Sequence, residues 1–237
     1  GNTVDPLTLI DKYGADTVRM FTLFAAPPDQ SLDWSSSGVE GSFRFLNRLW
    51  KVVSDHECVS WEKKQLTDLN SEQKQFRYKI HSTLKKVTDD YARRQTFNTA
   101  IAASMELLNA TTKFKDQVDS DLGRALLQEA LEIIILMLSP IVPHFCHVLW
   151  NHLGHKGAVM DASWPNPIEE ALTQDTIVIV LQVNGKLRDR IEVSEDTSKE
   201  ELEQLAVTNS SVKRFIEGKN IQKIIVVPKR LVNIVAK

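Results

Sequence analysis

A helical repeat decides the fold, and it is clearest in residues 70–91, NSEQKQFRYKIHSTLKKVTDDY. Large apolar residues recur there at steps of three and four, the spacing of one face of an α-helix. Asn70 and Gln73 precede that face at the spacing of a capping box, which predicts where the helix starts. The apolar positions are Phe76, Ile80, Leu84, Val87 and Tyr91.

The same spacing continues on both sides of this stretch. Ser37 and Glu40 form a second capping box before another apolar stripe. Residues 97–108 and 122–137 repeat the pattern. Amphipathic helices joined by short polar loops bury their stripes against one another. We therefore predict an antiparallel helical bundle over residues 37–165.

Residues 1–36 predict two short helices that pack on another part of the protein. Asp5 caps the first helix and Pro6 occupies its first turn, while Gly14 ends it. Asp16 is placed to cap the second helix. That helix is too apolar to stand free in water.

The pattern changes after a proline-containing linker at residues 166–173. Residues 174–237 predict strands and helices in the order ββααββ, which makes a small α+β domain. Asn184 and Gly185 separate the first two strands, and this pair favours a type I′ turn because both central residues need positive φ. The predicted fold is mainly α, a helical bundle followed by a small α+β domain.

The composition is that of a globular protein, with 42% hydrophobic and 25% charged residues. The net charge of −2 gives no overall sign of nucleic-acid binding. Residues 173–237 nevertheless hold 11 basic and 9 acidic residues, against 18 and 22 in the rest. The apolar runs fall far short of the ~20 residues that span a bilayer. With Cys58 and Cys146 as reduced thiols, we expect a cytoplasmic monomer without membrane attachment.

The sequence contains none of the common catalytic motifs, neither a glycine-rich phosphate loop nor GxSxG, HExxH or CxxC. Four histidines and a cysteine do fall within residues 144–155. On a helical wheel His147 and His152 lie about 140° apart, so one metal ion cannot collect all of these side chains. We therefore predict no catalytic residue and no metal site in this chain.

Six stretches in order along the chain carry a resemblance to a known family. They are residues 2–6, residues 13–19 (YGADTVR), residues 32–34 with 39–46, residues 93–106, residues 140–150 with 164–165, and residues 182–188 (QVNGKLR). Together they resemble the bacterial-type leucyl-tRNA synthetases of class I, from just after the lysine–serine signature loop to the C-terminus. The bundle stretches alone would also fit the valyl, isoleucyl or methionyl enzymes, whereas the last stretch favours leucine.

The resemblance implies a division of labour. The full-length enzyme attaches leucine to its tRNA with ATP and Mg²⁺, and a separate domain hydrolyses mischarged products. This chain would be the C-terminal fragment, without either catalytic site and without a cofactor of its own. Its parts would be a stem-contact segment (1–36), an anticodon-binding-type bundle (37–165) and a C-terminal tRNA-binding domain (174–237). Its partners would be leucine-specific tRNA and the missing catalytic and editing domains.

Candidate tRNA contacts follow from local clusters of positive charge, because phosphate neutralisation needs basic patches rather than a basic protein. In the predicted hairpin, Arg188 and Arg190 are expected on one strand face about 6.6 Å apart, a spacing that suits neighbouring phosphates. The bundle arginines could instead pair with nearby acids. The full candidate set is Lys186, Arg188, Arg190, Lys229, Arg230, Arg93, Arg94, Arg44 and Arg48.

Two alternatives remain open from the sequence. One is the equivalent fragment of a valyl- or isoleucyl-tRNA synthetase. The other is a helical interaction protein without catalytic function, which carries a small α+β appendage and binds no RNA.

Overall fold

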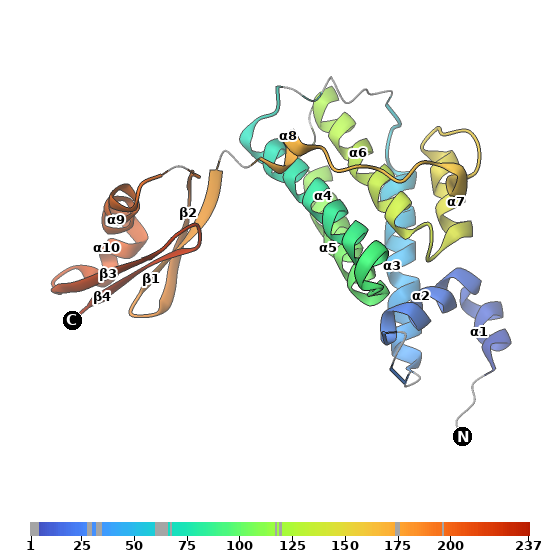
Figure 1. Ribbon diagram of the computed structural model, residues 1–237, viewed down its shortest axis with the longest axis horizontal. Coiled ribbons are helices and arrows are strands. Elements are labelled where there is room, and N and C mark those ends of the chain that lie inside the picture. The colour runs from blue at the N-terminus through green and yellow to red at the C-terminus, as the bar shows by residue number, and fades with distance from the viewer. Residues whose placement is uncertain are drawn as a thin grey trace. The chain divides into compact units, whose positions relative to one another are not determined.

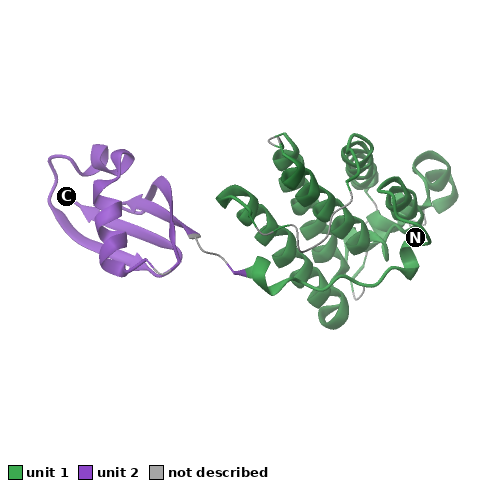
Figure 2. Ribbon diagram, turned by 90° about the horizontal axis from the view of Figure 1, so that it is seen from above, with its two compact units in different colours: residues 1–172 green, residues 173–237 purple. Residues whose placement is uncertain are grey.

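A computed structural model describes residues 5–27, 30–31, 35–59, 66, 68–116, 118, 120–173, 176–195 and 197–237. The chain divides into two compact units, residues 1–172 (the helical unit) and 173–237 (the sheet unit), which Figure 2 distinguishes by colour. The family-like residues 2–4 and 32–34 lie outside the described residues.

The helical unit is a succession of helices (Figure 1). In chain order they are α1 (Pro6–Tyr13), α2 (Ala15–Ala25), α3 (Ser36–Ser54), α4 (Ser71–Asp89), the π-helix η2 (Asp90–Arg94), α5 (Phe97–Lys115), α6 (Asp121–Leu138), α7 (Pro143–His152), the 3₁₀ turn η3 (Val159–Asp161) and α8 (Glu169–Leu172).

Side-chain caps explain where several of these helices start. The Asn70 amide oxygen accepts from the Gln73 N–H at 2.9 Å, and the Gln73 side chain accepts from the Asn70 N–H at 3.0 Å. This confirms the predicted capping box of α4. The box predicted at Ser37 is wrong, because Ser35 caps α3 through the Gly38 N–H at 3.2 Å.

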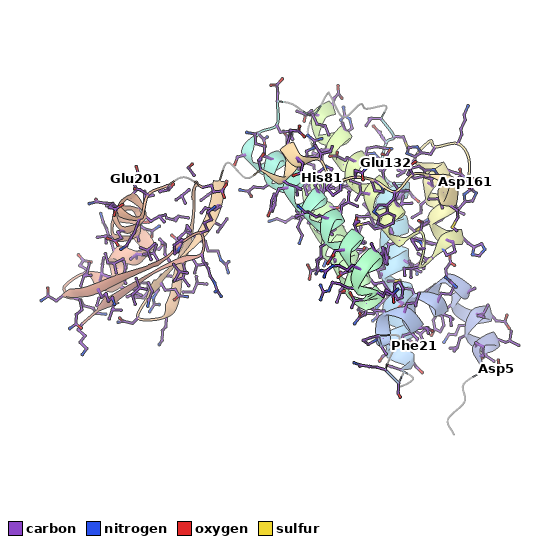
Figure 3. The ribbon with its side chains drawn as sticks, in the orientation of Figure 1. Asp5, Phe21, His81, Glu132, Asp161 and Glu201 are labelled. Carbon is purple, nitrogen blue, oxygen red and sulfur yellow. The ribbon has the colours of Figure 1, made fainter. Side chains whose placement is uncertain are left out.

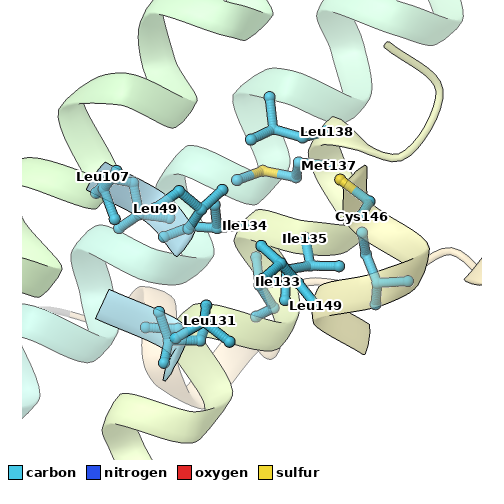
Figure 4. Close-up of a cluster of buried hydrophobic side chains, with 14 of the residues drawn as sticks. Leu49, Leu107, Leu131, Ile133, Ile134, Ile135, Met137, Leu138, Cys146 and Leu149 are labelled. Atoms are coloured by element: carbon cyan, nitrogen blue, oxygen red, sulfur yellow. The ribbon is translucent and has the colours of Figure 1, made fainter. Parts of the chain in front are cut away.

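The core of the helical unit is built around α6, whose side chains are buried on nearly every side. Figure 4 shows α6 residues such as Leu131 and Ile134 together with Leu49 from α3, Leu107 from α5 and Leu149 from α7. Phe76 and Phe114 stack with ring centres 4.2 Å apart, which joins α4 to α5. A helix that is apolar all round belongs at the centre of a bundle.

One buried carboxylate links α4 to α6. Glu129 accepts from the Arg77 guanidinium Nε at 3.2 Å and from His81 Nε2 at 3.2 Å. The Ile168 N–H in turn donates to His81 Nδ1 at 3.3 Å, and Figure 3 labels His81 on its helix. Because α8 also packs against α4, residues 166–172, expected to form a linker, lie with the helical unit.

The sheet unit is a four-stranded sheet with two helices. Its strands are β1 (Thr176–Val183), β2 (Lys186–Ser194), β3 (Ile221–Val227) and β4 (Leu231–Ala236), in the spatial order β2-β1-β4-β3. The β1–β4 pair is parallel and the others are antiparallel. Asn184 (φ 52°) and Gly185 (φ 76°) form the predicted hairpin turn.

The helices α9 (Lys199–Thr208) and α10 (Ser210–Ile216) contact the strands, and alternate strand residues form a core with them. The buried members are Ile179, Leu181, Val183, Val193, Leu202, Ala206, Val212, Val232, Ile234 and Ala236. The opposite side of the sheet is more exposed. The predicted mainly α fold, with a bundle followed by a small ββααββ domain, is confirmed.

Candidate nucleic-acid interface

The hairpin that carries three candidate contacts contains a β-bulge. Leu181 pairs with Asp189, but the next residue, Gln182, pairs with Leu187. Arg188 is therefore the extra residue of β2. In such a bulge the regular alternation of side chains between the two faces is interrupted.

The bulge turns Arg188 toward α10. Its guanidinium carbon lies 3.6 Å from the centre of the Phe215 ring, and its buried Nε has no hydrogen-bond partner among the described residues. The next residue, Asp189, faces the same layer, where its Oδ2 accepts from Asn209 Nδ2 at 2.9 Å. This hydrogen bond is the main reason why the pKa of Asp189 is lower than its ordinary value.

Arg190 lies on the other face of the sheet. It pairs with Val180, between the buried Ile179 and Leu181, and is itself exposed. The expectation that Arg188 and Arg190 project from one face is therefore wrong. A simple alternation of side chains predicted a shared face, and the bulge between the two arginines removes it.

The exposed side of the sheet, here called the open face, combines apolar and polar residues with two cations and one carboxylate. The strand register gives it Val178, Val180 and Gln182 of β1, Leu187, Arg190 and Glu192 of β2, Lys223, Ile225 and Val227 of β3, and Leu231, Asn233 and Val235 of β4. Val178 and Leu187 are each 51% exposed. Lys223 was missed from the sequence, because only the pairing of β3 with β4 brings it to the same face as Arg190.

The remaining candidates of the sheet unit lie at its turns. Lys186 follows the β1–β2 turn and is exposed. Lys229 (φ 57°) and Arg230 lie between β3 and β4, and the Lys229 ammonium pairs with the Glu195 carboxylate. In the described part of the chain, no partner is found for the side chains of Lys186, Arg190 or Arg230.

Two candidates of the helical unit lie in the π-helix, and each is paired with an acid one turn earlier. Arg93 donates to both oxygens of Asp89, at 2.7 and 2.9 Å, and this contact lowers the pKa of Asp89 and raises that of Arg93. Arg94 donates to Asp90, which is fully buried, at 3.2 Å. The structure therefore contains internal ion pairs at Arg93 and Arg94, which is the alternative to RNA contact.

The other two candidates of the helical unit lie one turn apart on α3. The Arg44 guanidinium is 3.9 Å from the Glu40 carboxylate, and both side chains are largely exposed. Arg48 lies with its guanidinium carbon 6.0 Å from the centre of the Phe45 ring. Surface contacts of this kind contribute little to folding, and they leave both arginines accessible.

The histidines near α7 contact different partners. His144 Nδ1 lies 3.3 Å from Asp16, His155 Nε2 lies 2.8 Å from Glu132, and the His155 ring stacks on Trp150. Within the described ranges, no three histidine, cysteine, aspartate or glutamate side chains gather as metal ligands. Among the same residues, no helix is long and apolar enough to cross a membrane.

Comparison with known families identifies the family of the helical part of the chain. The family model described as "Anticodon-binding domain of tRNA ligase" matches residues 73–204. The chain belongs to this family. The match covers α4 to α7 of this anticodon-binding domain and extends into the sheet unit as far as α9.

Curated relatives match the chain along essentially its whole length. The leucine–tRNA ligase of Nitrosococcus oceani is 55% identical over 99% of this chain, and that of Thioalkalivibrio sulfidiphilus is 55% identical over 100%. In both cases the chain spans 29% of the relative's own length.

Solved structures share the fold. A ternary complex of LeuRS, tRNA and LeuAMS from Agrobacterium radiobacter K84 matches all of this chain with a TM-score of 0.76 at 24% identity, and the match covers 31% of that chain. A methionyl-tRNA synthetase from Mycobacterium tuberculosis, in its apo form, matches 66% of the chain with a TM-score of 0.50 at 17% identity, over 36% of its own length.

Proposed function

We propose that this chain is the tRNA-docking portion of a leucine–tRNA ligase. The observation that carries the proposal is the 55% identity to such ligases over essentially the whole chain. In full length, the enzyme would ligate leucine to its tRNA with ATP and Mg²⁺ in the cytoplasm, as a monomer. The catalytic and editing sites, and the residues that hold ATP and Mg²⁺, would lie in the part of the enzyme outside this chain.

The sheet unit is the part best suited to hold tRNA phosphates. Lys186, Arg190 and Arg230 are exposed cations without a recorded acid partner among the described residues. A cation that is already paired must give up its partner to bind a phosphate, whereas an unpaired one exchanges only water and counterions. Lys229 is paired with Glu195 and would contribute less.

Arg188 would act indirectly. Its guanidinium lies on the Phe215 ring and its Nε is buried, so it is held by α10 rather than presented to a ligand. We assign it the role of fixing the bulge, which in turn places Arg190 on the open face.

The candidates of the helical unit are proposed as secondary contacts. Arg93 and Arg94 would have to exchange Asp89 and Asp90 for phosphate oxygens. Arg44 and Arg48 lie on one exposed face of α3 and could contact the tRNA body with less rearrangement.

Charging assays on the full-length enzyme test the proposed activity. We expect the enzyme to attach leucine to tRNA, and a preference for valine or isoleucine would overturn the assignment in favour of a sister enzyme. We expect the isolated chain to show no leucine-dependent pyrophosphate exchange. Failure of the full-length protein to charge any tRNA would favour a helical interaction protein.

Salt-dependent tRNA binding by the full-length enzyme tests the interface. Arg190→Ala is expected to weaken binding and to reduce the slope of log affinity against log salt concentration by about 1. Lys199→Ala is the matched control, because Lys199 is an exposed cation on α9 that is paired with Glu203. Equal effects of the two substitutions would contradict a specific role for the open face.

A further inference from the structure

The helix α7 has no cap of its own. The residue before it is Val142, which makes no side-chain cap, and Pro143 occupies its first turn. A carboxylate from far away in the sequence takes this role, because Asp16 Oδ2 accepts from the Phe145 N–H at 2.6 Å. The Asp16 side chain is only 11% exposed. An acceptor at this position satisfies a free backbone N–H and lies at the positive end of the helix dipole.

Three residues further along α2, Arg19 binds the backbone of the residues that precede α7. Arg19 Nε donates to the Ile141 carbonyl at 3.1 Å, and a terminal nitrogen donates to the Pro140 carbonyl at 3.3 Å. These carbonyls belong to the short connection between α6 and α7. Asp16 therefore binds one backbone donor and Arg19 binds two backbone acceptors on the two sides of one turn.

These contacts anchor the start of the chain on the bundle. Thr17, Met20 and Phe21 of α2 are buried, and α2 contacts α3, α5 and α7. By contrast, α1 has no buried residue, and Gly14 (φ 84°) separates the two helices. α1 also contacts α3 directly, where the Tyr13 and Phe43 ring centres lie 5.5 Å apart, so the placement of α1 depends on this contact and on how α2 is held.

We propose that Asp16 and Arg19 are positioning residues that couple the bundle to the catalytic part of the enzyme. The proposal rests on the proposed function above. It requires that the segment leading into α1 and α2 joins the catalytic part, so that this pair of residues sets the position of bound tRNA relative to the leucyl-adenylate. Leucine activation needs no tRNA and does not depend on this alignment, whereas transfer to tRNA does.

The test compares the two reactions in the full-length enzyme. Asp16→Ala and Arg19→Ala are expected to lower kcat/KM for tRNA leucylation at least tenfold, with leucine-dependent pyrophosphate exchange within twofold of wild type. Asp16→Asn keeps an oxygen that can accept from the Phe145 N–H, so it is expected to restore leucylation to within threefold.

Matched controls separate positioning from general damage. Asn70→Ala removes the cap of α4, where Asn70 accepts from the Gln73 N–H at 2.9 Å, without touching α1, α2 or the α6–α7 connection. Lys51→Ala removes an exposed cation from α3 as a control for Arg19→Ala. Both controls are expected to leave the two reactions within twofold of wild type.

Several outcomes would overturn the inference. A parallel fall in both reactions, in proportion to folded enzyme, would mean that the two residues only stabilise the fold. If the alanine variants do not fold, Arg19→Lys decides, because one ammonium group cannot reproduce both guanidinium bonds. It is expected to lower leucylation several-fold at unchanged exchange, and full leucylation would refute the inference. A wild-type enzyme that does not leucylate would instead refute the proposed function.

Discussion

In the helical unit, Arg93 and Arg94 are bound by acids one helical turn away, whereas in the sheet unit Lys186 and Arg190 have no such partner among the described residues. The two units also differ in their cores. The helical unit buries ion pairs inside a bundle, while the sheet unit leaves one face of its sheet largely uncovered. The comparison teaches that a basic residue is a stronger candidate for an RNA contact when its own neighbours do not already neutralise it.

The largest expected effect tests how far the helical unit depends on its internal charges. Glu129→Ala leaves Arg77 and His81 buried without their acid, and loss of one member of a buried pair costs about 3–5 kcal/mol. Urea unfolding followed by tryptophan fluorescence measures this unit alone, because all five tryptophans precede residue 173. Glu106→Ala, which breaks an exposed pair with Lys79, is the control and should cost less than about 1 kcal/mol.

The second prediction tests how closely α3 packs against α2. A Cβ atom on Gly38 would lie 2.6 Å from the Phe21 ring, so Gly38→Ala should destabilise the helical unit by about 1–3 kcal/mol. Gly41, one turn further along α3, meets nothing closer than 3.9 Å. Gly41→Ala should therefore stabilise the unit by roughly 0.5–1 kcal/mol, and the same sign for both variants would contradict this account.

A third prediction separates two arginines of the sheet unit. Arg188→Ala loses the contact with the Phe215 ring and should destabilise the sheet unit by about 1 kcal/mol. Hydrogen–deuterium exchange is the measurement, because this unit contains no tryptophan for fluorescence. We expect faster exchange in β2 and α10 of the Arg188→Ala variant. Arg190→Ala should change stability by less than about 0.5 kcal/mol while weakening tRNA binding. Equal exchange in both variants would mean that Arg188 is not structural.

The smallest effect is a loss of stability between pH 7 and pH 5.5 that only the helical unit should show. All six histidines lie in the helical unit. Burial lowers the pKa of His56 below its ordinary value, although its hydrogen bond to Gln128 at 2.6 Å opposes the shift. As pH falls below about 6.5, the unfolded chain takes up this proton first, so the folded state loses stability.

Urea midpoints at pH 7 and pH 5.5 measure this loss of stability in the helical unit. His56→Gln removes the titrating group and should flatten the dependence. An unchanged pH dependence in that variant would assign the effect to another histidine.

The comparison also explains which features could be predicted from the sequence. The capping box at Asn70 and the turn at Asn184 depend on residues at most three positions apart, so a short window contains all that is needed. Asp16 was expected to cap α2, and this was wrong because its partner, the Phe145 N–H, is 129 residues away. No local pattern contains that information.

The candidate interface was predictable only in part, for the same reason. Position along the chain located Lys186 and Arg190 in the hairpin. The face on which each arginine lies depends on the bulge opposite Leu181, which arises from pairing between two strands. Lys223 reaches the open face only through the pairing of β3 with β4. Contacts between distant segments thus decide which charges lie together.

The hairpin turn has a consequence for the chemical durability of the protein. An asparagine followed by glycine ages by attack of the glycine backbone nitrogen on the asparagine side chain, with loss of ammonia. Here the Asn184 amide bonds to the backbone of Ala236 through both its nitrogen and its oxygen, at 2.9 and 3.0 Å, and the Gly185 N–H donates to Asn233 at 3.0 Å. Because both reacting groups are held apart by the end of β4, the folded turn resists deamidation, and unfolding of that last strand exposes it.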